Sequence, residues 1–164
     1  MKSLCLKQAK LNSWANNLIR EHMEAFTLDE LSIKTPYGTV KDLTVHLINT
    51  INHWLDFFDE YFKFPRGEDD IDYNNWLEVL KLWEDTDKRL EDIIEDFDEN
   101  ELEDYFLYSH NNVEQYKLKF CDLFLHLTTH SYYHRGQLAI LFREHNLEPL
   151  PPVDADDYFK ILVN

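Results

Sequence analysis

The chain contains few residues that interrupt a helix. Only 3 glycines and 5 prolines occur among its 164 residues, and Pro149, Pro151 and Pro152 lie close together near the C-terminus. Proline ends helices because it lacks an amide hydrogen, and glycine weakens them because it loses more backbone freedom on folding than any other residue. Long helices are therefore the structure that the sequence most favours.

Apolar residues recur at helical spacing along most of the chain. The spacing predicts four long helices and a short terminal one, over residues 4–26, 39–62, 76–97, 119–145 and 154–162. The sequence TVKD predicts a capping box at the start of the second helix, because the Thr39 hydroxyl and the Asp42 carboxylate can each accept a hydrogen bond from the other's amide. Residues 64–75 are predicted to form a connector.

Residues 104–120 show a different pattern, in which apolar and polar side chains alternate on either side of Asn111 and Asn112. This alternation favours a small hairpin or an ordered extended loop over helix. The whole pattern predicts an all-α fold, an antiparallel four-helix bundle with the hairpin or loop before the last long helix. The chain has the usual length of one domain, so we expect a single domain over residues 1–164.

The chain is strongly acidic, with 32 Asp and Glu against 16 Lys and Arg and a formal net charge of −16. Such a charge repels phosphate backbones, so nucleic acid is not an expected partner. Much of the acid falls within residues 84–104, where we expect the solvated face of the third helix and a loop. A metal store or an acidic interaction tail is the alternative for this segment.

The sequence also bears on location. No run of the chain reaches the ~18 apolar residues of a membrane span, and the N-terminal residues lack the apolar core of a signal peptide, so no membrane partner is expected. Cys5 and Cys121 form no CxxC pair and are expected to be free thiols. Free thiols agree with a cytoplasmic protein, because that compartment is reducing.

Three histidines follow one another at intervals of four in HLTTHSYYHRGQ, residues 126–137. A helix advances 100° per residue, so His126, His130 and His134 share one face of the fourth helix. The same face carries Leu123, Leu127, Tyr133, Gln137 and Leu141, and is therefore predicted to face the core.

A buried imidazole without a hydrogen-bond partner costs about 1–3 kcal/mol, and one shared metal ion would satisfy several imidazoles at once. The spacing alone does not decide for a metal, because a helix without one could bond its histidines to tyrosines such as Tyr132 and Tyr133. A site inside a bundle also needs a ligand from another helix. The second helix offers His46 and His53, seven residues apart on one stripe, and either could face the fourth helix.

The sequence resembles the DinB-like family. LFLHLTTHSYYHRGQLAILFREHNLEP is similar to that family's last-helix signature, and LTVHLINTINHWL is similar to its second-helix signature. WANNLI in the first helix and DADDYF near the end also fit, so the resemblance spans nearly the whole chain. It implies that His46, His130 and His134 bind a divalent metal, with nickel or zinc expected first and iron, manganese or copper as alternatives. His53 and His126 then line the site.

Two positions depart from the family pattern. Thr129 stands where the family often has Asn, and Ile51 stands where it often has Asp. The missing Asp removes a partner for an imidazole N–H, which bears on metal affinity and orientation. Gln137 is expected to orient a ligand or a metal-bound water.

Three neutral imidazoles would leave the ion its full charge and an open position, as in catalytic sites. Bound water would have its pKa lowered, and a bound thiol would be deprotonated. The resemblance favours the thiol: it implies a thiol S-transferase, related to enzymes that use bacillithiol or mycothiol, in which a metal-bound thiolate attacks an electrophilic small molecule. A metal-hydroxide hydrolase and a non-enzymatic metal-stabilised bundle are the alternatives.

Gln137, Arg135 and Tyr133 are the candidate catalytic residues beside the metal ligands. Arg135 is the basic residue nearest in sequence for an anionic thiol, with a structural salt bridge as the equal alternative. Aromatic residues such as Phe57 and Phe58 are expected to pack in the core of the bundle. The alternative is that some of them form an apolar face between two subunits of a homodimer.

Overall fold

A computed structural model describes residues 1–62, 73–110 and 114–163 of the protein. In chain order its elements are α1 (Lys2–Met23), α2 (Leu28–Leu31), β1 (Lys34–Thr35), β2 (Gly38–Thr39), α3 (Val40–Phe62), α4 (Trp76–Asp96), a 3-10 turn (Glu99–Glu101), β3 (Tyr105–His110), β4 (Glu114–Lys119), α5 (Phe120–Glu144) and α6 (Ala155–Val163). The predicted all-α fold is confirmed, and each long helix lies within a few residues of its predicted range.

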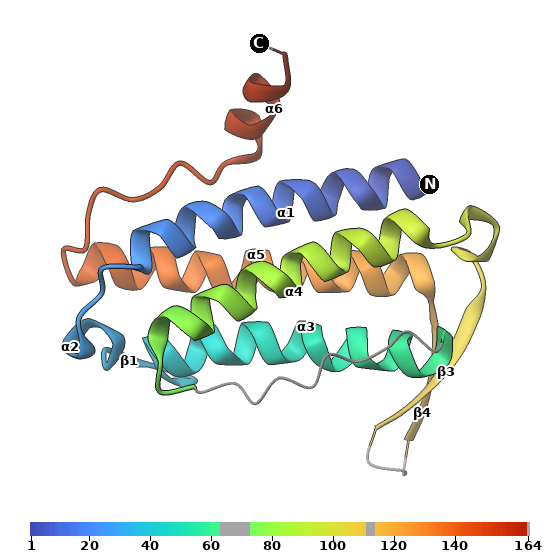
Figure 1. Ribbon diagram of the computed structural model, residues 1–164, viewed down its shortest axis with the longest axis horizontal. Helices are drawn as coiled ribbons and strands as arrows, with labels where there is room; N and C mark the ends of the chain where they lie inside the picture. Colours follow the sequence, from blue (N-terminus) through green and yellow to red (C-terminus); the bar gives the residue numbers. More distant parts are fainter. Residues whose placement is uncertain (63–72, 111–113, 164) are drawn as a thin grey trace.

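The four long helices form a bundle in which α1 and α3 each pack against both α4 and α5 (Figure 1). The helices α4 and α5 therefore occupy opposite corners. Figure 1 also shows that α3 and α4 run in one direction and that α1 and α5 run in the other. The neighbours α3 and α5 are consequently antiparallel, which decides which of their residues lie at the same level.

The core of the bundle is built from large side chains that the described helices turn inward. Trp83, Phe58 and Phe124 are fully buried, and the Phe58 and Phe124 rings stack with their centroids 5.3 Å apart. Phe58 therefore packs in the core and is not available for a subunit interface, while Phe57 is half-buried against Phe106 of β3. Among the helices that the structure describes, none combines the length and apolar character that crossing a membrane requires.

Two capping boxes fix the helix starts that precede the site. The predicted one is confirmed: the Thr39 amide donates to Asp42 Oδ2 at 2.8 Å, and the Asp42 amide donates to Thr39 Oγ1 at 3.1 Å. A second box was not predicted. Thr27 and Glu30 cap α2 in the same way, so the first helix ends at Met23 and not at residue 26.

Between α2 and α3 the structure has a small hairpin. Its strands β1 and β2 pair Lys34 with Thr39 and Thr35 with Gly38. Gly38 has a φ of 110°, and a Cβ there would lie 2.5 Å from the Asp42 carboxylate, so both its backbone and its surroundings require glycine. The turn holds Tyr37 at its tip.

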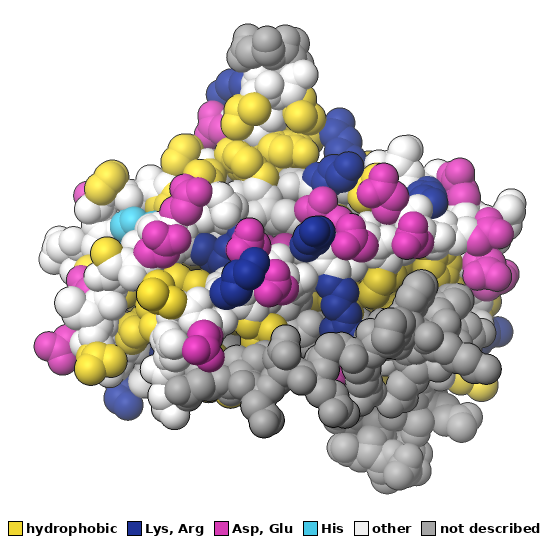
Figure 2. All heavy atoms as spheres, viewed as in Figure 1, with side chains coloured by type: hydrophobic (Ala, Val, Ile, Leu, Met, Phe, Trp, Pro, Cys, Tyr) yellow, Lys and Arg dark blue, Asp and Glu magenta, His cyan; other side chains and the backbone are white. Residues whose placement is uncertain are grey.

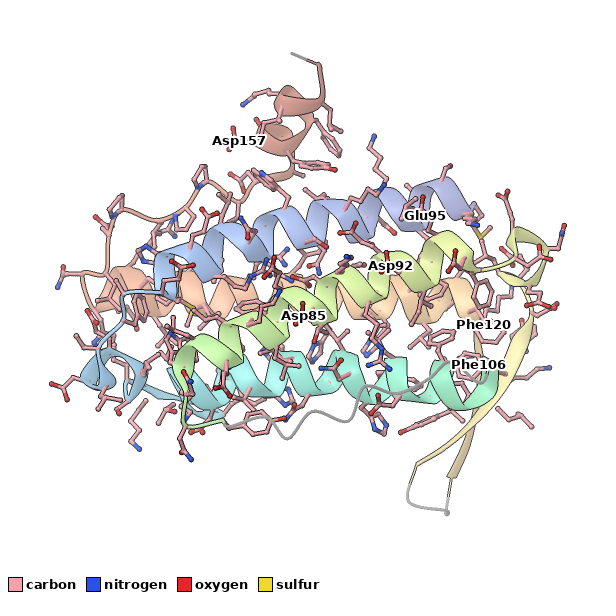
Figure 3. All side chains as sticks on the ribbon, in the orientation of Figure 1. Asp85, Asp92, Glu95, Phe106, Phe120 and Asp157 are labelled. Carbon is pink, nitrogen blue, oxygen red and sulfur yellow. The ribbon has the colours of Figure 1, made fainter. Side chains whose placement is uncertain are left out.

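The predicted hairpin before the last helix is confirmed as the antiparallel pair β3 and β4. It packs at one end of the bundle, where Phe106 of β3 stacks on Phe120 of α5 with ring centroids 4.9 Å apart (Figure 3). At the other margin α6 stands away from the bundle (Figure 1) and touches α1 through the Tyr158 and Trp14 rings, 5.4 Å apart.

Candidate metal centre

Two antiparallel helices bring three imidazoles together inside the bundle. His46 comes from α3, and His130 and His134 come from α5. One ring nitrogen from each lies within 4.8 Å of the other two. His134 is buried, whereas His46 and His130 are half-buried, so the group lies at the edge of the core with one side toward solvent.

The level of each residue along α3 and α5 explains why His46 meets the pair and His53 does not. Because the helices are antiparallel, moving from His46 to His53 along α3 corresponds to moving back along α5 toward its start. Trp54 accordingly lies beside His126, with ring centroids 6.5 Å apart. His53 instead places Nε2 2.9 Å from the Tyr108 hydroxyl of β3. The geometry thus resolves the choice that the sequence left open.

Gln137 orients His134 within this group. The His134 Nδ1–H donates to Gln137 Oε1 at 2.7 Å, which leaves the Nε2 lone pair directed at the other histidines. His130 Nε2 lies 3.1 Å from His134 Nε2. Two nitrogens bound at about 2.0–2.1 Å to one tetrahedral zinc lie about 3.3 Å apart, so this pair is spaced for a shared ion. Gln137 therefore holds the His134 ring from outside the group of three histidines.

The surroundings of His130 and His134 favour the neutral forms of these two imidazoles. Burial lowers the pKa of His130 from 6.5 to about 4, with further lowering from the neighbouring His134, His46 and His126. Burial likewise lowers the pKa of His134, opposed by its hydrogen bond to Gln137. Buried His130 Nδ1 has no hydrogen-bond partner among the described residues. Neutral imidazoles with converging lone pairs are what a divalent cation requires.

Tyr37 is a member of the site that the sequence did not reveal. Its ring stacks on His46 with centroids 4.9 Å apart and meets His134 edge-on at 5.0 Å. Tyr133, which precedes His134 on α5, has its ring centroid 5.0 Å from that of His134, but Tyr133 is 60% exposed. The prediction that Tyr133 faces the core is therefore wrong, because it lies at the edge of the histidine stripe.

Arg135, the third candidate catalytic residue, points away from the histidines and into the space between α5 and α1. Its Nη1 donates to the side-chain oxygens of Asn12 and Asn16, at 2.5 Å each. Asn16 and Arg20 in turn donate to Asp87 of α4. This buried polar network favours a structural role for Arg135, and the spacing of four between residues 12, 16 and 20 is the signal that could have revealed it.

The metal-free alternative assigned the histidines to tyrosine partners. Tyr132 instead lies over the Arg135 guanidinium, 4.5 Å from it, and Tyr133 meets His134 through its ring. Among the described residues the triad's hydrogen-bond partners are Gln137 and the neighbouring imidazole. Cys5 is buried, Cys121 is half-buried, and both are free thiols outside the triad.

Comparison with known proteins agrees with the fold. Among curated proteins, none matches the chain. The crystal structure of a DinB-like protein, YjoA from Bacillus subtilis, has a similar fold, with a TM-score of 0.63 at 15% identity over 90% of this chain and 98% of that one. The model of the DinB family matches residues 1–159. Since that match covers nearly the whole chain, the protein belongs to the DinB family.

Proposed function

We propose that the protein is a divalent-metal-dependent enzyme that transfers a low-molecular-weight thiol to an electrophilic small molecule. The observation that carries the proposal is the convergence of His46, His130 and His134 nitrogens within 4.8 Å of one another. Imidazole nitrogens suit nickel and zinc, and they also accept iron, manganese or copper. We expect nickel or zinc.

The residues present fit such an ion. The lowered pKa of His130 keeps its imidazole ring neutral over the neutral pH range, and Gln137 holds His134 in the tautomer that offers Nε2. A divalent ion held by three neutral imidazoles keeps its full charge, retains an open coordination position, and lowers the pKa of a thiol or water bound there.

The residues around the three histidines would contact a bound small molecule and exclude water from part of the site. Tyr37 covers one side of His46 and His134 with its ring, which keeps water from that side. Tyr133 and His126 are exposed beside the triad, where a small molecule approaching the open side would meet them. Arg135 is engaged with Asn12 and Asn16, so contacts to the charged groups of bacillithiol or mycothiol must come from residues other than Arg135.

Two general properties of the chain bear on the kind of substrate and on the compartment. The net charge of −16 suits a small-molecule substrate better than a nucleic acid. The free thiols Cys5 and Cys121 suit the reducing cytoplasm, where low-molecular-weight thiols are kept reduced.

The test is conjugation of a panel of electrophiles by metal-loaded, metal-stripped and metal-restored protein, each with and without thiol. We expect thiol-dependent conjugation that disappears on chelation and returns with the ion, in wild type and in His53→Ala but not in His46→Ala. Turnover without thiol would replace the transferase with a hydrolase. Conjugation that is the same with and without the metal would overturn the proposal, and loss of thermal stability on chelation without any turnover would assign the metal a structural role.

A further inference from the structure

The buried part of the described chain holds two arginines and one carboxylate. Arg20 and Asp87 form an ion pair, with Arg20 Nη1 2.6 Å from Asp87 Oδ2. Arg135 forms no ion pair within the described residues and is linked to Asp87 through the Asn16 carboxamide. Burial lowers the pKa of Arg135 from 12.5 to about 10, so its guanidinium is still charged at neutral pH. Because an isolated charge is costly to bury, Arg135 requires a negative group beside it.

Two hydrogen-bond donors beside this charge have no acceptor. Among the described residues, the buried side-chain nitrogens without a partner are those of Asn12 Nδ2, Arg135 Nη2, Trp83 Nε1 and His130 Nδ1. The first two belong to groups that are themselves joined, because Arg135 Nη1 donates to Asn12 Oδ1. Covalent geometry therefore keeps Asn12 Nδ2 and Arg135 Nη2 within about 7 Å of each other. One acceptor between two N–H groups spans about 6 Å, so a single bound species could serve both.

The unpaired donor of Asn12 does not depend on how its amide is oriented. A guanidinium can only donate, so Asn12 must turn its oxygen toward Arg135 and its nitrogen away. Asn16 is held in the same way, but its nitrogen donates to Asp87 Oδ1 at 2.7 Å. Asn16 is thus satisfied at both ends, whereas Asn12 keeps a buried N–H for which the described residues provide no acceptor.

The side chains around the two donors are small and enclosed. Ala9 and Ser131 are fully buried and lie one turn before Asn12 and Arg135 on the same helix faces. Because α1 and α5 run in the same direction (Figure 1), these two small residues lie at a similar level of the interface. The Tyr132 ring covers the Arg135 guanidinium, 4.5 Å from it. A species bound here must therefore be small and without its hydration shell.

We propose that Asn12 and Arg135 bind a small monovalent anion such as chloride in the interface between α1 and α5. An anion only accepts hydrogen bonds, as these two donors require, and it supplies the negative charge that Arg135 lacks. A water molecule would bring two hydrogens that need acceptors of their own, and it would leave the charge uncompensated. The anion joins α1 to α5 on the side of α5 that faces away from the histidines, so its test is separate from that of the proposed function.

The first test is thermal unfolding of the full chain, dialysed into gluconate and then titrated with chloride at constant ionic strength. Gluconate is the reference because it is too large for a site enclosed by buried side chains. The melting temperature is expected to rise by about 3–5 °C once chloride exceeds its Kd tenfold, equally with and without a chelator. A melting temperature independent of chloride overturns the proposal, and so does a rise that chelation abolishes, because it would place chloride at the metal centre.

An isosteric variant supplies the negative charge from the chain itself. Asn12→Asp places a carboxylate beside Arg135, so in gluconate its melting temperature should exceed that of wild type, and its response to chloride should be lost. Asn49→Asp is the matched control, because it adds the same charge at an exposed position of α3 and should respond to chloride as wild type does. An equal chloride response in Asn12→Asp and wild type would mean a general salt effect and would overturn the proposal.

Crystals of wild type grown with bromide in place of chloride locate the ion without relying on the folding of any variant. Bromide is recognised by its anomalous scattering, which a water molecule lacks. We expect an anomalous peak within hydrogen-bonding distance of both Asn12 Nδ2 and Arg135 Nη2. Density there without an anomalous signal would identify a water molecule and contradict the proposal, and so would bromide found only on the surface.

Discussion

The helices α4 and α5 stand at opposite corners of one bundle and differ sharply in what they present to solvent. The outer face of α4 is charged, with Lys81 paired to Glu84 and to Asp85 at 3.0 and 2.9 Å (Figure 2). The outer face of α5 presents uncharged side chains, and its inner edge supplies His130 and His134. Both helices are long and both bury an apolar stripe, so the fold itself does not account for the difference.

The outer face of α4 is suited to contact with water, and the outer face of α5 is suited to contact with another molecule. Exposed ion pairs such as those of Lys81 contribute little to stability but keep the chain well hydrated. Exposed apolar side chains such as Leu125 and Ile140 of α5 are poorly hydrated, and covering them with a ligand or a partner is favourable. On this account the work of the protein is done along α5, and substitutions on the two helices should have very different effects.

The largest effect is expected where α4 turns inward. Asp87 is buried and accepts hydrogen bonds from Asn16 and Arg20 at 2.7 and 2.6 Å. Asp87→Ala leaves the buried Arg20 and Arg135 without their carboxylate and should lower the free energy of unfolding by about 3–5 kcal/mol, measured by urea titration above pH 7. Asp85→Ala, two residues away on the outer face, should leave it nearly unchanged; equal losses in the two variants would contradict the contrast between the faces.

Metal binding should give the next largest effect. An ion that binds the folded state alone stabilises it by about 2.7 kcal/mol when its free concentration is one hundred times its Kd. Wild type and His53→Ala should show this gain in thermal unfolding with nickel or zinc, and His46→Ala should not. A gain that survives in His46→Ala would place the ion elsewhere on the chain.

The sequence predicted the helices and the last hairpin because long apolar periodicity and alternation are local patterns. It also indicated the two histidines that α5 contributes to the candidate site, since His130 and His134 share a helix face through local spacing. Tyr37 was missed because a short hairpin brings its ring onto His46. That hairpin depends on the positive φ of Gly38 beside Asp42, which can be recognised only in the folded structure. The capping box of Thr27 and Glu30 could have been found, because its spacing is visible in TLDE.

The polar network shows a second limit of sequence reasoning. Arg135 directly follows a predicted ligand, and nothing local distinguishes a side chain that faces the metal from one that faces α1. Its partners Asn12 and Asn16 lie more than a hundred residues away. The choice between His46 and His53 was of the same kind, because it depended on the relative level of two helices.

A smaller effect is expected at Gln137, which holds His134 through a 2.7 Å hydrogen bond. Partners of this kind change metal affinity by about 10–100-fold when they are removed. Gln137→Leu should therefore weaken binding of nickel or zinc in calorimetric titration, with little change in stability of the metal-free protein. Gln137→Glu keeps the acceptor oxygen and should retain most of the affinity; if both variants bind as wild type does, Gln137 has no part in orienting the ligand.

The smallest effect concerns pH in metal-free protein. The pKa of His130 is about 4 in the folded state against 6.5 for an ordinary histidine, so between these values the unfolded chain binds more protons and the free energy of unfolding rises with pH. The slope stays below about 1.4 kcal/mol per pH unit, because one imidazole exchanges at most one proton between the folded and unfolded states.

Asp87 acts in the opposite sense over an overlapping range, since burial raises its pKa from 3.8 to about 7 and the folded state then holds the extra proton. His130→Ala removes the first contribution and keeps the second. Denaturant titrations across pH 4 to 6.5 should therefore show wild type gaining stability relative to His130→Ala as the pH rises. A difference that stays constant or falls would mean that His130 titrates normally.

The measurement that bears most directly on the α5 account is the metal content of protein purified without a histidine tag. Wild type and His53→Ala should carry close to one ion per chain, and His46→Ala, His130→Ala and His134→Ala should carry almost none. If wild type stays free of metal even after incubation with nickel or zinc, or if His53→Ala loses the ion as fully as His46→Ala does, the three converging histidines are not the metal centre.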